Sequence, residues 1–112
     1  NALGYSLADR GLRLPEAKAL ISQALALAPK DPFITDSLGW AEFRSGNLEA
    51  ALELLQAAFN DKPDAEIAAH LGEVLWVLKR PAQATEVWRQ GIGLSPSNET
   101  LLETLKRLQV SL

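Results

Sequence analysis

The sequence of 112 residues has no cysteine, no methionine and a single histidine. Without cysteine the chain has no disulfide, no thiolate metal ligand and no thiol nucleophile. The one histidine, His70, has neither a second imidazole for a zinc site nor a partner set for a catalytic triad. We therefore predict no metal, no cofactor and no catalytic residue.

Long apolar runs and basic stripes are also missing from the sequence. No run approaches the roughly 20 apolar residues that cross a bilayer, so we expect no membrane insertion by this segment. The net charge of −3 comes without the basic stripe typical of nucleic-acid-binding proteins. Acidic residues are scattered singly, as on solvated helix faces. An enzyme and a nucleic-acid-binding protein are both disfavoured.

One pattern is present three times, with a period of about 34 residues. It consists of a Leu-Gly pair, an alanine 12 or 13 residues after the glycine, a large apolar residue four further on, and a closing proline. The three copies are Leu3-Gly4, Ala17, Ile21 and Pro29; Leu38-Gly39, Ala51, Leu55 and Pro63; and Leu71-Gly72, Ala84, Trp88 and Pro96. A fixed period in this range indicates stacked helix-turn-helix units, none of which buries its apolar face alone.

The apolar spacing within each unit is helical, and nothing alternates with the period of two typical of strands. Seven helices are predicted, three of them capped by Asp31, Asp64 and Asn98. Glycine inside a helix costs about 1 kcal/mol relative to alanine, so the repeated glycines indicate close approach of the paired helix. We expect the repeated alanines opposite them, and the large apolar residues between neighbouring units, with Trp88 buried between the second and third.

The domain organisation follows from these boundaries. We predict one repeat domain over 1–112, with a first unit at 1–31 that is truncated at its start, a second at 32–64 and a third at 65–96. Residues 97–112 are expected to form a capping helix with an apolar stripe of Leu101, Leu102, Leu105, Leu108 and Leu112. We interpret the chain as a segment excised from a longer repeat protein.

The spacing, the small residues and the closing prolines resemble those of the tetratricopeptide repeat family, over residues 1–96. The resemblance implies an all-α, right-handed superhelical stack of three repeats plus a C-terminal capping helix. It also implies that the first helix of each pair lines a concave face. The ligand-binding residues expected on that face are Tyr5, Asp36, Trp40, Phe43, Arg44, Glu73 and Trp76.

The aromatic residues of this set have two possible roles. Phe43 and Trp76 either face the groove or pack against the neighbouring unit, whereas Tyr5 and Trp40 are expected to face outward beside the repeated glycines. Exposed aromatics on one concave face suit capture of an apolar or extended peptide. His70 is expected at the groove edge or on the surface. The carboxylate clamp of chaperone adaptors is absent, because only Arg44 is basic at the comparable positions.

The strings NALGYSLADR, DPFITDSLGW and DAEIAAHLGEVLW are similar to a narrower group, the C-terminal repeats of Gram-negative bacterial tetratricopeptide proteins, several of them envelope lipoproteins. This resemblance implies an adaptor or scaffold whose partner is a periplasmic protease or another envelope complex. It also implies the bacterial envelope, on the periplasmic side of the outer membrane, with the cytoplasm as the alternative.

Our leading hypothesis is therefore a non-catalytic protein–protein interaction module that binds a peptide or protein segment in a concave, aromatic and mildly acidic groove. The alternative is a structural C-terminal end of a longer array, with the binding surface upstream. A regulatory domain fused to an enzyme comes third. The exposure of Tyr5 and Trp40 distinguishes the first two.

Overall fold

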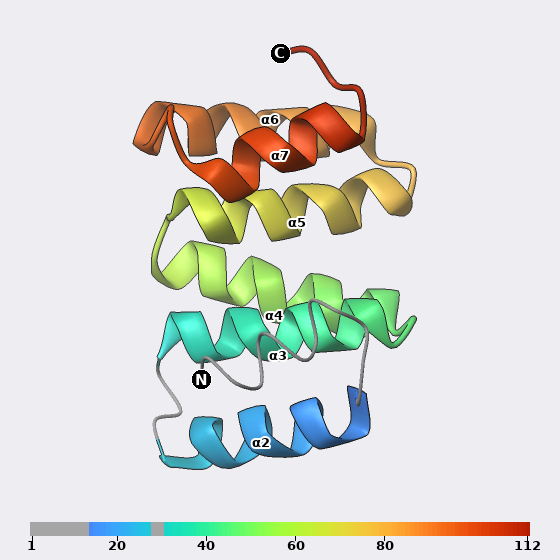
Figure 1. The fold of residues 1–112 in the computed structure, drawn as a ribbon, viewed down its shortest axis with the longest axis vertical. Coiled ribbons are helices and arrows are strands. Elements are labelled where there is room, and N and C mark those ends of the chain that lie inside the picture. The colour runs from blue at the N-terminus through green and yellow to red at the C-terminus, as the bar shows by residue number, and fades with distance from the viewer. Residues whose placement is uncertain (1–13, 28–30) are drawn as a thin grey trace.

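The computed structural model describes residues 14–27 and 31–112. This part contains six helices and no strand, so the predicted all-α fold is confirmed. The helices are α2 (Leu14–Leu27), α3 (Pro32–Arg44), α4 (Leu48–Asp61), α5 (Ala65–Val77), α6 (Pro81–Leu94) and α7 (Glu99–Arg107). They are stacked along the long axis of the molecule, from α2 at one end to α6 and α7 together at the other (Figure 1). The first of the seven predicted helices lies outside the described residues.

The described first helices begin at the caps that the sequence predicts. Asp31 accepts hydrogen bonds from the backbone N–H groups of Phe33 and Ile34, and Asp64 accepts the equivalent pair at the start of α5. Asn98 accepts one from Leu101, at 2.9 Å. These side chains satisfy N–H groups that the first turn of a helix leaves without a partner.

The helices α3, α5 and α7 also end in the same way. Each is followed by a residue with positive φ, namely Gly46, Lys79 and Gln109. The next backbone N–H then bonds back to a carbonyl five residues earlier, from Asn47 to Glu42, Arg80 to Leu75 and Val110 to Leu105, each at 2.9 Å. This is the hydrogen bond of a Schellman motif. Because it has the same kind of N-cap and the same C-terminal motif as α3 and α5, α7 resembles a shorter version of the first helix of a repeat.

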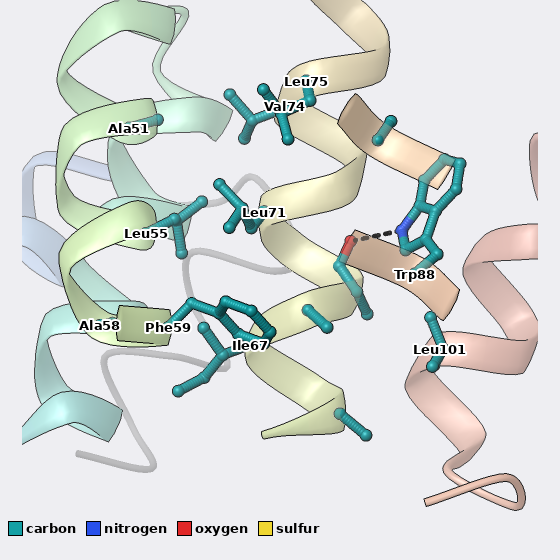
Figure 2. Close-up of a cluster of buried hydrophobic side chains, with 14 of the residues drawn as sticks. Ala51, Leu55, Ala58, Phe59, Ile67, Leu71, Val74, Leu75, Trp88 and Leu101 are labelled. Carbon is teal, nitrogen blue, oxygen red and sulfur yellow. Dashed lines mark hydrogen bonds between the residues drawn. The ribbon is translucent and has the colours of Figure 1, made fainter. Parts of the chain in front are cut away.

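Trp88 fills the space above Gly72. The indole is fully buried, and its N–H donates to the Ala69 carbonyl at 3.4 Å. A Cβ at Gly72 would lie 2.0 Å from the indole nitrogen. The burial of Trp88 is thus confirmed, but its predicted place between the second and third units is wrong. The ring lies against α5 of its own unit, on the side away from Leu55 (Figure 2), because a glycine there leaves room for it.

Gly39 has the same relation to Leu55 that Gly72 has to Trp88. A Cβ at Gly39 would lie 2.8 Å from Leu55 Cγ, so the predicted close approach of the paired helix is confirmed. The expected partners Ala51 and Ala84 are buried, but the atoms nearest to the glycines belong to the larger side chains. Ile21 packs with Trp40 and Ala41, between the first and second units as predicted.

The apolar face of α7 is narrower than the predicted stripe. Leu101 and Leu105 are buried in the main core, and Leu108 packs against it. Leu102 and Leu112 are exposed, at 45% and 43%, so including them in the stripe was wrong. Leu102 follows Leu101 directly, and successive residues of a helix point about 100° apart. The helix ends at Arg107, well before Leu112.

The stack is closer on one side than on the other. The first helices α3 and α5 approach each other, and so do α5 and α7. In the described part of the chain, no Cα atom of α4 lies within 8 Å of one in α6. The first helices therefore form a continuous inner side, while the second helices stand apart on the outer side. When neighbouring units are closer on one side than on the other, each unit is slightly rotated against the next, and the stack curves. Helical repeats produce a concave surface in this way.

Candidate functional site

A cavity of about 450 Å³ lies on the side of the first helices. We call it the inner groove. Its lining is mainly polar, with residues from α3, α5 and α7: Trp40, Arg44, Glu66, His70, Glu73, Thr100, Glu103, Thr104 and Arg107. The groove therefore lies where the resemblance places the concave face, but α7, expected only as a cap, forms one of its walls.

Trp40 contributes to the inner groove as a buried ring. Its indole stacks on the His70 imidazole, with ring centres 4.3 Å apart, and on the Phe43 ring at 4.9 Å. Only 4% of Trp40 is exposed, so the expectation that it faces outward was wrong. Trp40, which follows Gly39, packs across the unit boundary onto α5 instead of pointing into solvent. Trp40 cannot offer a large free aromatic surface to a partner.

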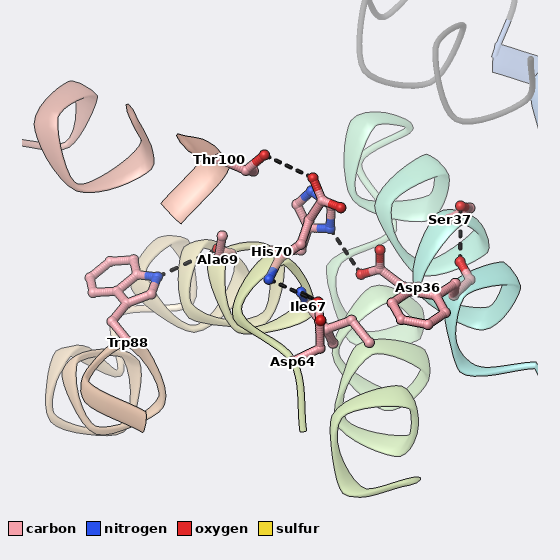
Figure 3. A network of polar contacts seen from close by, with 10 residues as sticks. Asp36, Ser37, Asp64, Ile67, Ala69, His70, Trp88 and Thr100 are labelled. Atoms are coloured by element: carbon pink, nitrogen blue, oxygen red, sulfur yellow. Dashed lines mark hydrogen bonds and ion pairs between the residues drawn. The ribbon is translucent and has the colours of Figure 1, made fainter. Parts of the chain in front are cut away.

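Behind the groove, Asp36 of α3 and His70 of α5 form a buried pair. The Asp36 carboxylate lies 2.9 Å from His70 Nδ1, and both residues are nearly inaccessible (Figure 3). Burial raises the pKa of Asp36 above its ordinary value of 3.8, against the opposing effect of His70. His70 was expected at the groove edge or surface. It does line the groove, but at 2% exposure it is a core residue, because the pairing with Asp36 satisfies it there.

The buried pair does not extend to a catalytic triad through the neighbouring serine. Ser37 follows Asp36 directly, but its hydroxyl donates to the Phe33 carbonyl on the same helix, at 3.0 Å. In Figure 3 this bond points along α3 and away from His70. A serine nucleophile needs a base within hydrogen-bond reach, but the Ser37 hydroxyl is bonded to a backbone carbonyl and not to His70. The described residues also contain no group of three or more metal-binding side chains.

Two further polar contacts join α5 to α7 across the inner groove. The Thr100 hydroxyl donates to Glu66 Oε1 at 2.8 Å. Arg107 donates through both terminal nitrogens to the Glu73 carboxylate, with Nη1 3.1 Å from Oε2. Like Asp36–His70, each of these contacts joins residues 34 positions apart. We call the three the cross-unit contacts, and they fix neighbouring first helices in register.

Two charged side chains of the inner groove remain outside these contacts. Arg44 is exposed on the α3 wall, and Glu103 is exposed on the α7 wall. Within the described part of the chain, no hydrogen bond or ion pair involves either side chain. The groove thus offers one cation and one anion on opposite walls.

The structure divides the predicted ligand-binding residues. Trp40, Arg44 and Glu73 line the inner groove, and Asp36 lies buried behind it. Phe43 and Trp76 are partly buried and pack against the core, and the ring contact of Trp76 is with Trp88 of its own unit, 5.7 Å away between ring centres, and not with the neighbouring unit. Tyr5 lies outside the described residues.

Sequence reasoning missed the groove residues Glu66, Thr100, Glu103, Thr104 and Arg107. Most of them belong to α7, which the broken repeat pattern identified only as a cap. A usable signal was present, because residues of complementary chemistry recur at a separation of one repeat period. An acid at position i and a hydrogen-bonding partner at i+34 (histidine, threonine or arginine) meet on neighbouring first helices.

Comparison with known proteins adds the family. No protein-family model matches the chain. However, it is 48% identical over 108 residues, 96% of its length, to a TPR repeat-containing protein of Pseudomonas aeruginosa. The resemblance to the tetratricopeptide repeat family is confirmed. The cell division cycle protein 16 homologs of human and mouse are 34% and 33% identical to this chain, over 73% of it.

These tetratricopeptide relatives are much longer than the chain, which spans 18% of the bacterial protein and 15% of each mammalian one. At the level of the family, the similarity implies a protein–protein interaction module, and such modules are generally non-catalytic. None of the six described helices combines the length and the apolar character needed to span a membrane.

Proposed function

We propose that the chain is a non-catalytic adaptor or scaffold module that binds an extended segment of a partner protein in the inner groove. The observation that carries this proposal is the open polar groove between α3, α5 and α7, with Arg44 and Glu103 on its opposite walls. A partner segment with an acidic residue facing Arg44 and a basic residue facing Glu103 is complementary to it. Electrostatic complementarity of this kind contributes mainly specificity and association rate.

The role of the aromatic residues in this proposal differs from the expectation. Trp40 forms the floor of the groove and supports His70, so binding depends on charge and shape more than on exposed aromatic area. The cross-unit contacts keep the walls in register before the partner arrives. A preorganised groove loses less conformational entropy on binding than one that must order itself.

The biological setting is proposed from the resemblance to the C-terminal repeats of bacterial envelope proteins. We place the parent protein in the bacterial envelope, on the periplasmic side of the outer membrane, with a periplasmic protease or another envelope complex as its partner. The similarity to a Pseudomonas aeruginosa protein supports a bacterial setting. Recovery of the full-length parent in the cytoplasmic fraction of its cells would contradict this placement.

A second function is favoured by one observation. Trp40 is buried, which is what the structural alternative requires of this residue. In that case the chain stabilises the end of a longer array, and the partner binds elsewhere in the parent protein. The two proposals differ in whether the charges of the inner groove matter for partner binding.

A charge-reversal experiment separates them. Partner proteins are captured from a bacterial lysate with the wild-type chain, with Arg44→Glu/Glu103→Lys, and with the control Arg89→Glu/Glu99→Lys. All three have the same net charge, and the control residues are exposed outside the inner groove. We expect the groove variant to bind the captured partner about tenfold more weakly, which corresponds to about 1.4 kcal/mol. Equal capture by all three would support the structural alternative.

A further inference from the structure

A second groove lies on the outer side of the stack, between α4 and α6. It encloses about 580 Å³ and shares no lining residue with the inner groove. We call it the outer groove. The lining residues that matter for its chemistry are Leu52 and Glu53 of α4, Leu75 of α5, Arg80, and Glu86 and Val87 of α6.

The floor of the outer groove is apolar because of the way the units stack. With no Cα atoms of α4 and α6 within 8 Å of each other, the surface of α5 is reached between them, at Leu75. Leu75 itself is buried, with 3% of its surface exposed, so the apolar surface that is open to water comes from Leu52 and Val87, which flank it from the two walls and are only partly buried. Apolar surface that is open to water gains free energy from being covered.

The rim of the outer groove carries opposed carboxylates. Glu53 lies on the α4 wall and Glu86 on the α6 wall. Neither forms an ion pair within the described residues, and Glu86 accepts one hydrogen bond, from the Gln90 amide of its own helix. A single cation, Arg80, lies at one end, directly before α6. Each long wall therefore carries one carboxylate, and one end carries a cation.

We propose that the outer groove binds a basic amphipathic helix of a partner protein. The apolar floor of the outer groove offers no hydrogen-bond partner to the backbone groups that an extended peptide leaves unbonded, whereas the inner groove is lined mainly by polar side chains. A helix brings its own backbone hydrogen bonds and presents an apolar stripe at i, i+3, i+4 and i+7. That stripe covers Leu52, Leu75 and Val87, while lysines or arginines on its two flanks meet Glu53 and Glu86.

Arg80 gives this helix a direction. The C-terminal end of a helix carries partial negative charge from its last carbonyl groups. The bound helix therefore lies with its C-terminus toward Arg80. This site is independent of the inner groove, so either proposal can fail without the other.

Binding is measured with a fluorescently labelled synthetic helix that has leucines along one stripe and lysines on both flanks. A matched peptide has glutamate at every lysine position, and a third has a proline in the middle of the basic sequence. We expect the wild-type chain to bind the basic helix at least tenfold more tightly than either of the other two. No binding of the basic helix, or equal binding of the acidic peptide, would overturn the proposal.

Chain variants then locate the site. Glu53→Lys/Glu86→Lys changes the rim, and Glu49→Lys/Asp61→Lys makes the same charge change at exposed positions of α4 outside both grooves. The rim variant is expected to reverse the preference and bind the acidic helix, whereas the control variant and Arg44→Glu/Glu103→Lys keep the wild-type preference.

Equal effects of the rim and control variants would mean non-specific charge attraction. Equal binding of the proline peptide would mean an extended occupant, and a rim-dependent dimer in sedimentation would mean a second copy of this chain. Each of these three results overturns the proposal.

Discussion

The two grooves come from one stack of helices, yet their chemistry is opposite. On the inner side, α5 approaches both α3 and α7 and is joined to each by polar side chains, so the inner groove is lined with charge. On the outer side, α4 and α6 stand apart, and the space between them reaches down to the apolar surface of α5. The spacing of the helices thus decides which layer of side chains each face shows to a partner.

The central helix α5 explains how one stack produces both faces. It contributes Glu66, His70 and Glu73 to the inner groove and Leu75 to the floor of the outer groove. Its third side carries Gly72, against which Trp88 packs. Polar, aliphatic and glycine positions therefore divide this helix among three neighbours, and a change on one side alters the geometry of the others.

The largest expected effect on stability comes from a substitution in α5 that pushes α6 away from it. Gly72→Ala places a methyl group 2.0 Å from the Trp88 indole, a rigid and fully buried ring that has no room to move. Overpacking of a core costs about 1–3 kcal/mol and sometimes more, and we expect about 3 kcal/mol of unfolding free energy to be lost here. Denaturant unfolding of the variant measures this loss.

Gly39→Ala and Gly93→Ala serve as matched comparisons for that substitution. At Gly39 the new methyl meets the flexible Leu55 side chain at 2.8 Å, and the better helix propensity of alanine offsets part of the clash. At Gly93 no atom lies within 4 Å, so alanine should stabilise by up to about 1 kcal/mol. If Gly72→Ala is no more harmful than Gly39→Ala, Trp88 does not occupy the place described.

A smaller effect on the unfolding free energy is expected from Asp36–His70, the buried pair among the three cross-unit contacts. Burial raises the pKa of Asp36, so the folded protein holds this proton more tightly than the unfolded chain does. The contribution of Asp36 to stability is then largest at low pH, and it is lost as the pH rises from 3.8 through the folded-state pKa. Relative to Asp36→Asn, the wild-type chain should therefore lose unfolding free energy as the pH rises over this range.

The measurement is the difference in unfolding free energy between the wild type and Asp36→Asn at a series of pH values. Taking the difference removes the titration of the other carboxylates, which both proteins share. A wild-type advantage that grows with pH would mean that His70 stabilises the carboxylate more than burial penalises it. The buried pair would then act as an ion pair in the folded state.

Much of the fold was predictable because it depends on local and periodic signals. The caps at Asp31, Asp64 and Asn98 each need only a side chain and one or two backbone N–H groups that lie two or three residues further along the chain. The repeated glycines indicated close helix packing because glycine inside a helix is otherwise unfavourable. Neither signal depends on how one unit is rotated against the next.

The candidate site was less predictable because its residues meet across unit boundaries. Whether Trp40 points into solvent or onto His70 depends on the angle between α3 and α5, which no single unit specifies. Arg107 belongs to a helix outside the repeat pattern, so the pattern could not place it in the groove. Trp88 was assigned to a boundary between units, whereas it fills the space between the two helices of its own unit, because a large residue on a helix can fill either of two adjacent gaps.

The central claim is that the stack is closed on the side of the first helices and open on the side of the second. Because the chain has no native cysteine, each engineered pair of cysteines reports on a single distance. Glu66→Cys/Thr100→Cys spans the inner side, between helices that have Cα atoms within 8 Å of each other, and Glu53→Cys/Glu86→Cys spans the outer groove, between helices that have none. Disulfides rarely join residues whose Cα atoms are more than about 7 Å apart. Under mild oxidation the inner pair should form an intramolecular disulfide faster than the outer pair. An outer pair that oxidises as fast as the inner pair, or faster, would contradict the account.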